Sequence, residues 1–374
     1  MIVHFDCRHF RGDRPCGPHK REGVHCEGCP FHDPLRFRIL VVKLDAVGDV
    51  LRTTCILPGL RATHPDARID WITREDAAPV FHGNPLLDRL IPYPGTAWSD
   101  ILANEYDMVI NLDTSPESAR IGTLARAGKR IGFGFDPRGH VFPWNKEAMD
   151  WFEMGLFDDV KIRNRKTYQQ IALEICGLEG QDRPIHLYLG EAEKKWSRDW
   201  AERKGLVRDR QVIGLNTGAG KRWGRKKWTE EGFVELVRLL RSSPKAGANP
   251  PQILLLGGPE EEDRNRRIVD RVGEHVFDAG TGHELREFFS LVDLCDLLVT
   301  GDTMALHVAV ALGKKVVALF GPTSAAEIEL YGRGRKITSD APCVGCYRTS
   351  CDVTPTCMER ISAEEVFRTV QELL

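Results

Sequence analysis

Short apolar runs alternate with longer amphipathic segments along most of the chain. The run at 38–44 is rich in β-branched residues, which is typical of a strand buried on both faces of a parallel sheet. Further strand-like runs lie at 67–73, 106–113 and 129–135, and a glycine turn with a long helical pattern fills 45–65. Strands that alternate with helices predict a parallel α/β sheet.

A second alternation of the same kind fills the other half of the chain. Strands are predicted at 211–215, 252–258, 276–280, 297–301 and 315–321, helices at 229–243, 261–273, 285–295, 305–313 and 362–374, and a polar loop at 243–251. The pattern predicts two α/β domains, 36–182 and 183–374, preceded by a Cys-rich segment at 1–35. Ligands of such sheets bind at the carboxyl ends of the strands, so the cleft between the domains is the predicted site.

The overall composition is that of a soluble globular protein. Of 374 residues, 42% are hydrophobic and 28% are charged, which is ordinary for globular domains. The formal net charge of -2 gives no basic field, so no nucleic-acid partner is expected. No apolar run reaches the roughly 18 residues of a spanning helix, and the N-terminus has no secretory pattern. We therefore expect a cytoplasmic protein, with peripheral binding to a membrane surface left open.

The segment 301–324 places acidic and hydroxyl-bearing residues at two predicted turns. Asp302 follows a strand, His307 lies in the helix after it, and the next strand leads to a Gly-Pro-Thr-Ser turn at 321–324. We predict that another helix starts at this turn, and that its free N–H groups attract phosphate. Both turns fall at the same edge of the sheet, which predicts one ligand site. In the alternative interpretation, Asp302 and Thr323 only cap helices.

Gly48 and Asp49 form a similar strand-to-helix turn in the first half of the chain. Asp49 has two candidate roles there. It either caps the helix or acts as a general base that projects into the cleft with no basic partner adjacent. The residues alone leave both roles open.

A basic, glycine-rich loop follows the first strand of the second half. Its cations are Lys221, Arg222, Arg225, Lys226 and Lys227. Flexible glycines and cations at the end of a strand suit a diphosphate, although a solvated basic loop would have the same composition.

Acidic residues follow the next strand, after a Gly-Gly-Pro turn. Glu260, or one of its neighbours, is a candidate acceptor for hydrogen bonds from ribose hydroxyl groups. In the alternative interpretation, Glu261 and Glu262 have a structural role only, because acidic residues are favourable in the first turn of a helix.

Eight of the 11 cysteines fall into two clusters. Cys7, Cys16, Cys26 and Cys29 supply four thiolates to a segment without a core, so we predict a structural zinc ion or iron–sulfur cluster there. Disulfides and free thiols are the alternatives, and neighbouring histidines at 9, 19, 25 and 32 are alternative ligands. The second cluster, at 343, 346, 351 and 357, suits either a metal or packed thiols.

Three common motifs do not occur in the sequence. It has no Walker A motif, no clean G-x-G-x-x-G after the first strand and no G-x-S-x-G elbow. These absences argue against a P-loop NTPase, a dinucleotide oxidoreductase and an α/β hydrolase.

Four stretches together resemble glycosyltransferase family 9, the bacterial ADP-heptose:lipopolysaccharide heptosyltransferases. They are ILVVKLDAVGDVLRTT, KKWTEEGF, LLGGPEEED and GDTMALHVAVALGKKVVALFGPTS, and the resemblance covers 37–374 in the expected order. It implies the GT-B fold, in which two Rossmann-like domains face each other across a cleft. It also implies an inverting reaction without a catalytic metal or other cofactor.

The resemblance also implies roles for individual residues. Asp49 becomes the general base and Lys226 the group that binds the phosphate of the leaving nucleotide. The residues expected to bind the donor are Glu260, Asp302, Thr303, His307, Gly321, Thr323 and Ser324. The sequence departs from the family pattern at Met304, Ala305 and Thr229. The segment 1–35 has no counterpart in family members that consist of the two domains alone.

The implied reaction is transfer of a heptose, or a related sugar, from an ADP-sugar to a lipopolysaccharide core or related surface glycan. The expected partners are an ADP-heptose donor and a lipid-linked saccharide acceptor at the inner face of the cytoplasmic membrane. The competing hypothesis is a metal-bearing binding or regulatory protein on a degenerate GT-B scaffold.

Overall fold

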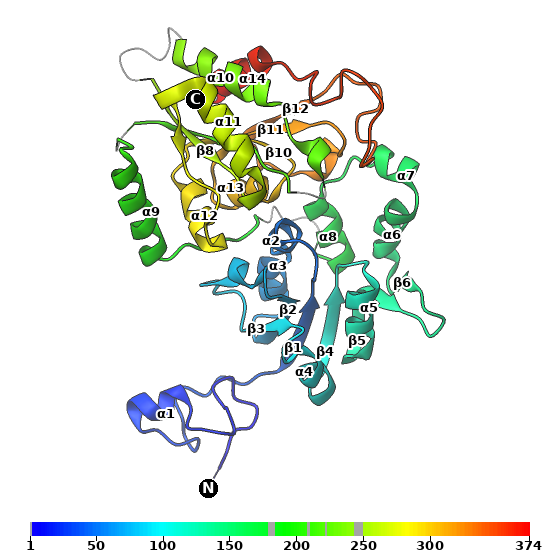
Figure 1. Cartoon of the computed structure of the whole chain (residues 1–374). Coiled ribbons are helices and arrows are strands. Elements are labelled where there is room, and N and C mark those ends of the chain that lie inside the picture. Colours follow the sequence, from blue (N-terminus) through cyan, green and yellow to red (C-terminus); the bar gives the residue numbers. More distant parts are fainter. Residues whose placement is uncertain (1, 179–183, 208–209, 221–222, 243–249) are drawn as a thin grey trace.

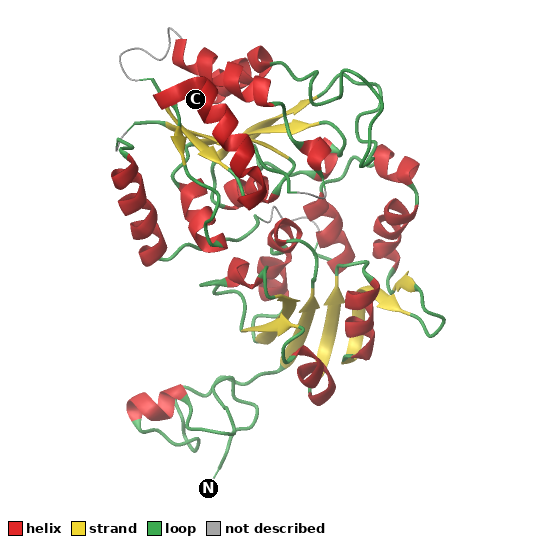
Figure 2. Cartoon of the chain, viewed as in Figure 1, coloured by secondary structure: helices red, strands yellow, loops and turns green. Residues whose placement is uncertain are grey.

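The computed structural model describes residues 2–178, 184–207, 210–220, 223–242 and 250–374. Two α/β domains lie one above the other, and a small N-terminal module, residues 2–34, projects from the far side of the first domain (Figure 1). In each domain helices flank a central sheet (Figure 2). The predicted boundary at 182/183 and most of the predicted loop at 243–251 lie outside the described residues, so the boundary stays a prediction.

The N-terminal domain is built on a six-stranded sheet of order β3-β2-β1-β4-β5-β6. Its strands are β1 (Phe37–Val42), β2 (Ala67–Arg74), β3 (Arg89–Tyr93), β4 (Glu105–Asn111), β5 (Arg126–Phe135) and β6 (Val141–Pro143). Its helices are α2 (Val47–Thr53), α3 (Ile56–Thr63), α4 (Ala97–Ala103), α5 (Pro116–Leu124), α6 (Met149–Leu156), α7 (Asp158–Arg163) and α8 (Tyr168–Cys176). All strand pairs are parallel except β5 with β6.

The C-terminal domain has a six-stranded parallel sheet of order β12-β11-β10-β7-β8-β9. Its strands are β7 (Val212–Asn216), β8 (Gln252–Leu256), β9 (Phe277–Asp278), β10 (Leu297–Gly301), β11 (Lys315–Phe320) and β12 (Gly334–Thr338). Its helices are α9 (Glu191–Lys204), α10 (Glu230–Ser242), α11 (Glu262–Val272), α12 (Leu285–Asp293), α13 (Met304–Ala311) and α14 (Ala363–Leu373).

Both sheets place their first strand beside their fourth. The chain order reverses between β1 and β4 in one domain and between β7 and β10 in the other. The central strands are fully buried at their carboxyl ends, as their apolar runs predict. A crevice opens at such a reversal point, so the fold itself selects the ends of these strands for ligand binding.

Two predicted helices differ in the structure. The pattern at 45–65 forms two helices, because the chain breaks at Thr54, whose hydroxyl donates to Leu51 O and accepts from His186 N. The prediction that a helix starts at the Gly-Pro-Thr-Ser turn was wrong, because the chain forms a single 3₁₀ turn there, Ala325–Glu327. The edge strands β3 and β12 were not predicted, since β3 carries Pro92 and β12 is mostly polar.

The N-terminal module contains one short helix, α1 (Gly17–Glu22), and otherwise loops. It docks onto the N-terminal domain through Arg8, which pairs with Asp33 of the module and with Asp88 just before β3. Arg8 also donates to the carbonyl of Asp66, which precedes β2. These contacts place the module at the amino ends of the strands, opposite the crevice.

Candidate active site

The two domains meet where α2 follows β1 and α13 follows β10. Gly48 of α2 lies against the imidazole of His307 on α13, and a Cβ atom at Gly48 would be 2.9 Å from His307 Cδ2. Both helices start at the carboxyl ends of their sheets, so their first turns lie at the crevice between the domains.

Asp49 lies in the first turn of α2 and does not cap it. The N-cap residue is Ala46, which has no side-chain cap bond. Asp49 Oδ1 instead pairs with Arg52 Nη2 at 2.7 Å. The expectation that Asp49 has no basic partner was therefore wrong, because a residue three positions later lies on the same helix face.

Charge around Asp49 keeps its carboxylate ionised. Burial opposes ionisation, but the positive charges of Arg52 and Lys43 outweigh it and hold the pKa of Asp49 below its usual range. Lys43 is buried beneath the turn, where it pairs with Asp45 and donates to Leu112 O at 2.6 Å. Asp49 can thus accept a proton or a hydrogen bond at neutral pH.

Arg52 is a residue of the crevice that the sequence interpretation missed. Its guanidinium lies 3.9 Å from the centroid of the Tyr168 ring, and its buried Nε has no hydrogen-bond partner within the described structure. A buried, unpaired N–H is costly, so Arg52 has donor capacity left for a ligand. Its spacing of three from Asp49 was the signal that could have found it.

Lys226 supplies the facing charge from the C-terminal domain. It ends the 3₁₀ turn Gly224–Lys226, and its Nζ pairs with Asp302 Oδ2 at 2.8 Å. Gly301 allows this approach, because a Cβ there would be 2.9 Å from Lys226 O. Lys221 and Arg222 of the same loop lie outside the described residues.

Asp302 is an ion-pair partner and not a helix cap. The N-cap of α13 is Thr303, without a side-chain cap bond; its hydroxyl contacts Thr300 Oγ1 at 3.1 Å and accepts from Asn216 Nδ2 at 3.3 Å. Burial opposes ionisation of Asp302, but Lys226 outweighs it and lowers the pKa of that carboxyl.

His307 is buried next to Asp49 and Asp302. Burial, aided by the charge of Arg52, lowers the pKa of His307 to about 4. The imidazole is therefore neutral at pH 7, although both carboxylates favour its protonation. A neutral ring can pack against Gly48 without bringing another charge into the crevice.

The Gly-Pro-Thr-Ser turn leaves one hydroxyl without a partner. Ser324 caps the 3₁₀ turn by accepting from Ala326 N at 3.2 Å, so Thr323 is not the cap. Thr323 is 4% exposed, and within the described chain its Oγ1 has no hydrogen-bond partner. A buried hydroxyl in this state suits a ligand oxygen.

Glu260 and Glu261 have different surroundings. Glu261 is buried, accepts from Gly258 N at 3.1 Å and pairs with Lys227 at 2.6 Å. Glu260 is exposed in the 3₁₀ turn Pro259–Glu261. The structure thus makes Glu261 a framework residue and leaves Glu260 accessible to a ligand.

The C-terminal Cys-rich segment braces the turn at 321–324. A Cβ at Gly321 would be 2.6 Å from Cys357 Sγ, and Tyr347 N donates to Pro322 O at 2.8 Å. Tyr347 OH donates to Glu327 at 2.6 Å, and Lys161 of α7 lies 3.7 Å from the centroid of the Tyr347 ring. The segment therefore joins the second side of the crevice to the N-terminal domain.

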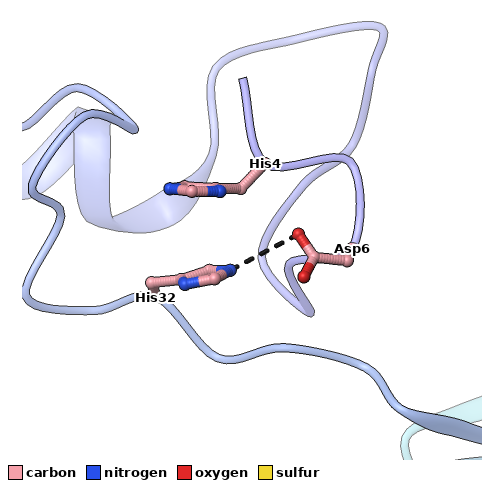
Figure 3. Close-up of side chains that lie close together, drawn as sticks. All are labelled: His4, Asp6 and His32. Atoms are coloured by element: carbon pink, nitrogen blue, oxygen red, sulfur yellow. Dashed lines mark hydrogen bonds and ion pairs between the residues drawn. The ribbon is translucent and has the colours of Figure 1, made fainter. Parts of the chain in front are cut away.

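One group of side chains has the spacing of a small metal site. His4, Asp6 and His32 have ligand atoms within 4.8 Å of one another, and they are the sole such group that the described residues contain. Figure 3 shows the two imidazoles stacked, with Asp6 beside His32. The group lies in the N-terminal module, away from the crevice.

The comparisons with known proteins concern the family and the fold of the chain. The family model of glycosyltransferase family 9 (heptosyltransferase) matches residues 96–356. Lipopolysaccharide heptosyltransferase 1 of Salmonella typhimurium is 25% identical, over 80% of this chain and 92% of the relative.

Two solved structures share the fold. A family 9 glycosyltransferase of Veillonella parvula has a TM-score of 0.73 at 20% identity, over 90% of this chain and 97% of that one. The ADP-heptose LPS heptosyltransferase II of E. coli has a TM-score of 0.64 at 21% identity, over 90% of this chain and 98% of that one.

Two Rossmann-like domains that close on a crevice define the GT-B class of glycosyltransferases. The chain belongs to glycosyltransferase family 9, and it is a glycosyltransferase.

Proposed function

We propose that the protein transfers a heptose from ADP-heptose to a lipopolysaccharide core acceptor, with inversion at the sugar carbon and without a catalytic metal. The observation that carries this proposal is the pair of charged groups facing the crevice from opposite domains, Asp49 with Arg52 and Lys226 with Asp302. The heptosyltransferase relatives support the choice of donor and acceptor. The boundaries 36–182 for the acceptor domain and 183–374 for the donor domain belong to the same proposal.

The donor diphosphate is assigned to the C-terminal domain. Lys226, the Thr323 hydroxyl and the backbone around Gly321 and Ser324 lie at the ends of β7 and β11, where phosphate oxygens would be held. Negative charge grows on the leaving phosphate during transfer, so a fixed ammonium group lowers the barrier. Glu260 is assigned to the ribose and Asp302, Thr303 and His307 to the sugar and phosphates.

The acceptor hydroxyl is assigned to Asp49. Its carboxylate is ionised, and the hydroxyl becomes much more acidic once its oxygen bonds to the sugar carbon. A base in one domain and a leaving group held by the other lie on opposite sides of that carbon. One displacement in this arrangement inverts the configuration, through an oxocarbenium-like transition state.

An exposed surface on the N-terminal domain suits a lipid-linked acceptor. Leu156, Phe157 and Ile162 are exposed on and between α6 and α7. The segment 156–166 has four basic residues against two acidic ones, and one of the acids, Asp159, pairs with Arg163 at 2.8 Å. Apolar side chains flanked by cations favour the headgroup region of an anionic membrane. None of the described helices is long and apolar enough to cross a bilayer. We therefore propose peripheral contact with the inner membrane face through α6 and α7.

The deciding experiment is a donor panel. Purified protein is incubated with a heptose-free lipopolysaccharide core acceptor and with ADP-heptose, ADP-glucose, UDP-glucose or GDP-mannose. Release of the donor's nucleoside diphosphate (ADP, UDP or GDP) and the mass of the extended acceptor are both measured. Heptose addition from ADP-heptose alone is the expected result, and extension by a hexose without heptose would assign another donor.

A further inference from the structure

The cysteines and histidines of the N-terminal module surround one cavity. Its volume is about 280 Å³, and its lining includes all four cysteines of the module. The same lining includes the five histidines at 4, 9, 19, 25 and 32. Side chains that are metal ligands in other proteins therefore converge on one space.

The module has no hydrophobic core to hold it together. Of residues 2–34, Pro18 alone is buried. Ile2, Phe5 and Phe31 are exposed. A segment of this length without a core folds when covalent or metal cross-links tie it.

The spacing of the sulfur atoms distinguishes two kinds of site. A tetrahedral zinc ion with bonds of about 2.3 Å draws its sulfur ligands to roughly 4 Å from one another. Among the described residues, no three cysteine sulfurs lie within 4.8 Å of one another. In every set of three, at least one pair of sulfurs is therefore farther apart than the ligands of a single zinc ion, and a polynuclear cluster allows such a separation.

The histidine and aspartate group fits a metal ion less well. The His4 and His32 rings stack with centroids 4.0 Å apart and an interplanar angle of 17°. Ring lone pairs lie in the ring plane, so those of stacked rings run side by side and do not converge on one point. Asp6 is already within 3.4 Å of His32 Nε2 (Figure 3).

We propose that Cys7, Cys16, Cys26 and Cys29 bind an iron–sulfur cluster. The four thiols come from three parts of the module. The backbone of Cys7 forms an isolated antiparallel β-bridge with Pro34. Cys16 caps α1, where its sulfur accepts a hydrogen bond from His19 N at 3.5 Å. Cys26 and Cys29 belong to one tight turn, in which Cys29 N donates to Cys26 O. The cluster therefore ties the two ends, the helix and the turn of the module.

The position of the module makes this cluster structural. Arg8 fixes the module at the amino ends of β2 and β3, whereas Asp49 and Lys226 lie at the carboxyl ends of the strands. The cluster therefore does not contact the reacting groups, and its loss should leave glycosyl transfer intact.

The test uses the full chain and two matched pairs of substitutions. The chain contains two C-x-x-C pairs, Cys26 with Cys29 and Cys343 with Cys346. Each pair is changed to serine in turn, and the proteins are purified without oxygen. Iron, acid-labile sulfide and zinc are counted, and visible absorption and Mössbauer spectra are recorded.

The wild-type chain should contain iron and acid-labile sulfide in equal amounts, about two or four of each per chain. The Cys26→Ser/Cys29→Ser variant should lose them, and the Cys343→Ser/Cys346→Ser variant should retain them. Sulfide and iron that persist in the Cys26→Ser/Cys29→Ser variant would overturn the proposal, as would stoichiometric zinc without sulfide in the wild type.

A third variant tests the competing ligand set even if the cysteine variants unfold. His4→Ala/His32→Ala removes both imidazoles of the stacked pair and leaves every thiol in place. The variant should retain the full iron and sulfide content. Loss of all metal from this variant, with a module that still resists protease, would assign the metal to His4, Asp6 and His32 and overturn the cluster.

Discussion

Gly48 and His307 are in direct contact across the two domains, at a distance that no side chain larger than hydrogen at position 48 would allow. The contact sets how closely the first turn of α2 approaches α13. Since Asp49 follows Gly48 directly, the same contact fixes the position of the proposed base relative to the donor domain.

Gly48→Ala should increase the distance between α2 and α13 and so displace the proposed base, Asp49, from the donor domain. The added methyl group must displace His307 or α2, and a misplacement of the base reduces kcat/KM on the order of 10- to 100-fold. ADP binding should stay near the wild-type value. The control is Gly155→Ala on α6, where a Cβ meets nothing within 4 Å. An unchanged kcat/KM in Gly48→Ala would show that the domains adapt freely.

Asp49→Asn should reduce kcat roughly 10²–10⁴-fold, because a general base acts in the chemical step. ADP affinity measured by calorimetry should not change. Asp45→Asn, in the same turn, is the control for local structure. Since the pKa of Asp49 lies below its usual range, the wild-type rate should also hold as the pH falls from 7 to 5. Transfer by Asp49→Asn at a tenth of the wild-type rate would rule out the base.

Lys226→Ala and Lys227→Ala form a matched pair. Each removes a cation from a carboxylate, the partly buried Asp302 or the buried Glu261, so both variants should lose stability. Only Lys226→Ala should weaken ADP binding, by about tenfold or more, because a charge-assisted hydrogen bond contributes about 1.5–3 kcal/mol. Equal losses of ADP affinity in the two variants would divide the phosphate role between the lysines.

Thr323→Val should weaken ADP binding without lowering the stability of the fold. The buried hydroxyl has no partner in the described structure, so its replacement by a methyl group should leave the free energy of unfolding unchanged or raise it. Affinity for ADP should fall by roughly tenfold, since one hydrogen bond to the phosphate is lost. Ser324→Ala, which removes a cap, should instead lower stability. A Thr323→Val variant that binds ADP normally would remove Thr323 from the donor site.

His307 should make the fold sensitive to acid. Its pKa is about 4 in the folded chain and 6.5 ordinarily, so the unfolded chain binds more protons between these values and stability falls as the pH drops. Between pH 7 and pH 5 the loss is about 2 kcal/mol. Urea unfolding of His307→Gln should show a pH-dependent loss smaller by that amount. Parallel curves for both proteins would show that folding does not lower the pKa of His307.

The sequence predicted the central strands well, because their apolar runs are buried on both faces. It placed Asp49, Lys226 and Asp302 at strand ends, and the parallel topology then brought them to one crevice. The pattern could not show the edge strands β3, β6 and β12, whose alternation is weak, or the break at Thr54, which depends on a hydrogen bond from His186.

The pairing of charges was also beyond the sequence. Lys226 and Asp302 are 76 positions apart, and their ion pair exists because β7 and β10 are neighbours. The framework role of Glu261 depends on its ion pair with Lys227, which the sequence alone does not show. Thr229 follows the buried Trp228, and its hydroxyl accepts from Gly232 N at 2.9 Å, which fixes the start of α10 without the proline of the family pattern.

Each domain neutralises its own charges at the crevice: Asp49 pairs with Arg52 in one domain, and Lys226 pairs with Asp302 in the other. Neither half therefore presents an unbalanced charge from these four groups to its partner. Bringing the halves together does not depend on attraction between opposite net charges, so added salt should have little effect on domain closure in the absence of substrate. The nucleotide sugar adds the negative charge of its diphosphate to the crevice. Ionic strength should therefore change the affinity for the nucleotide sugar.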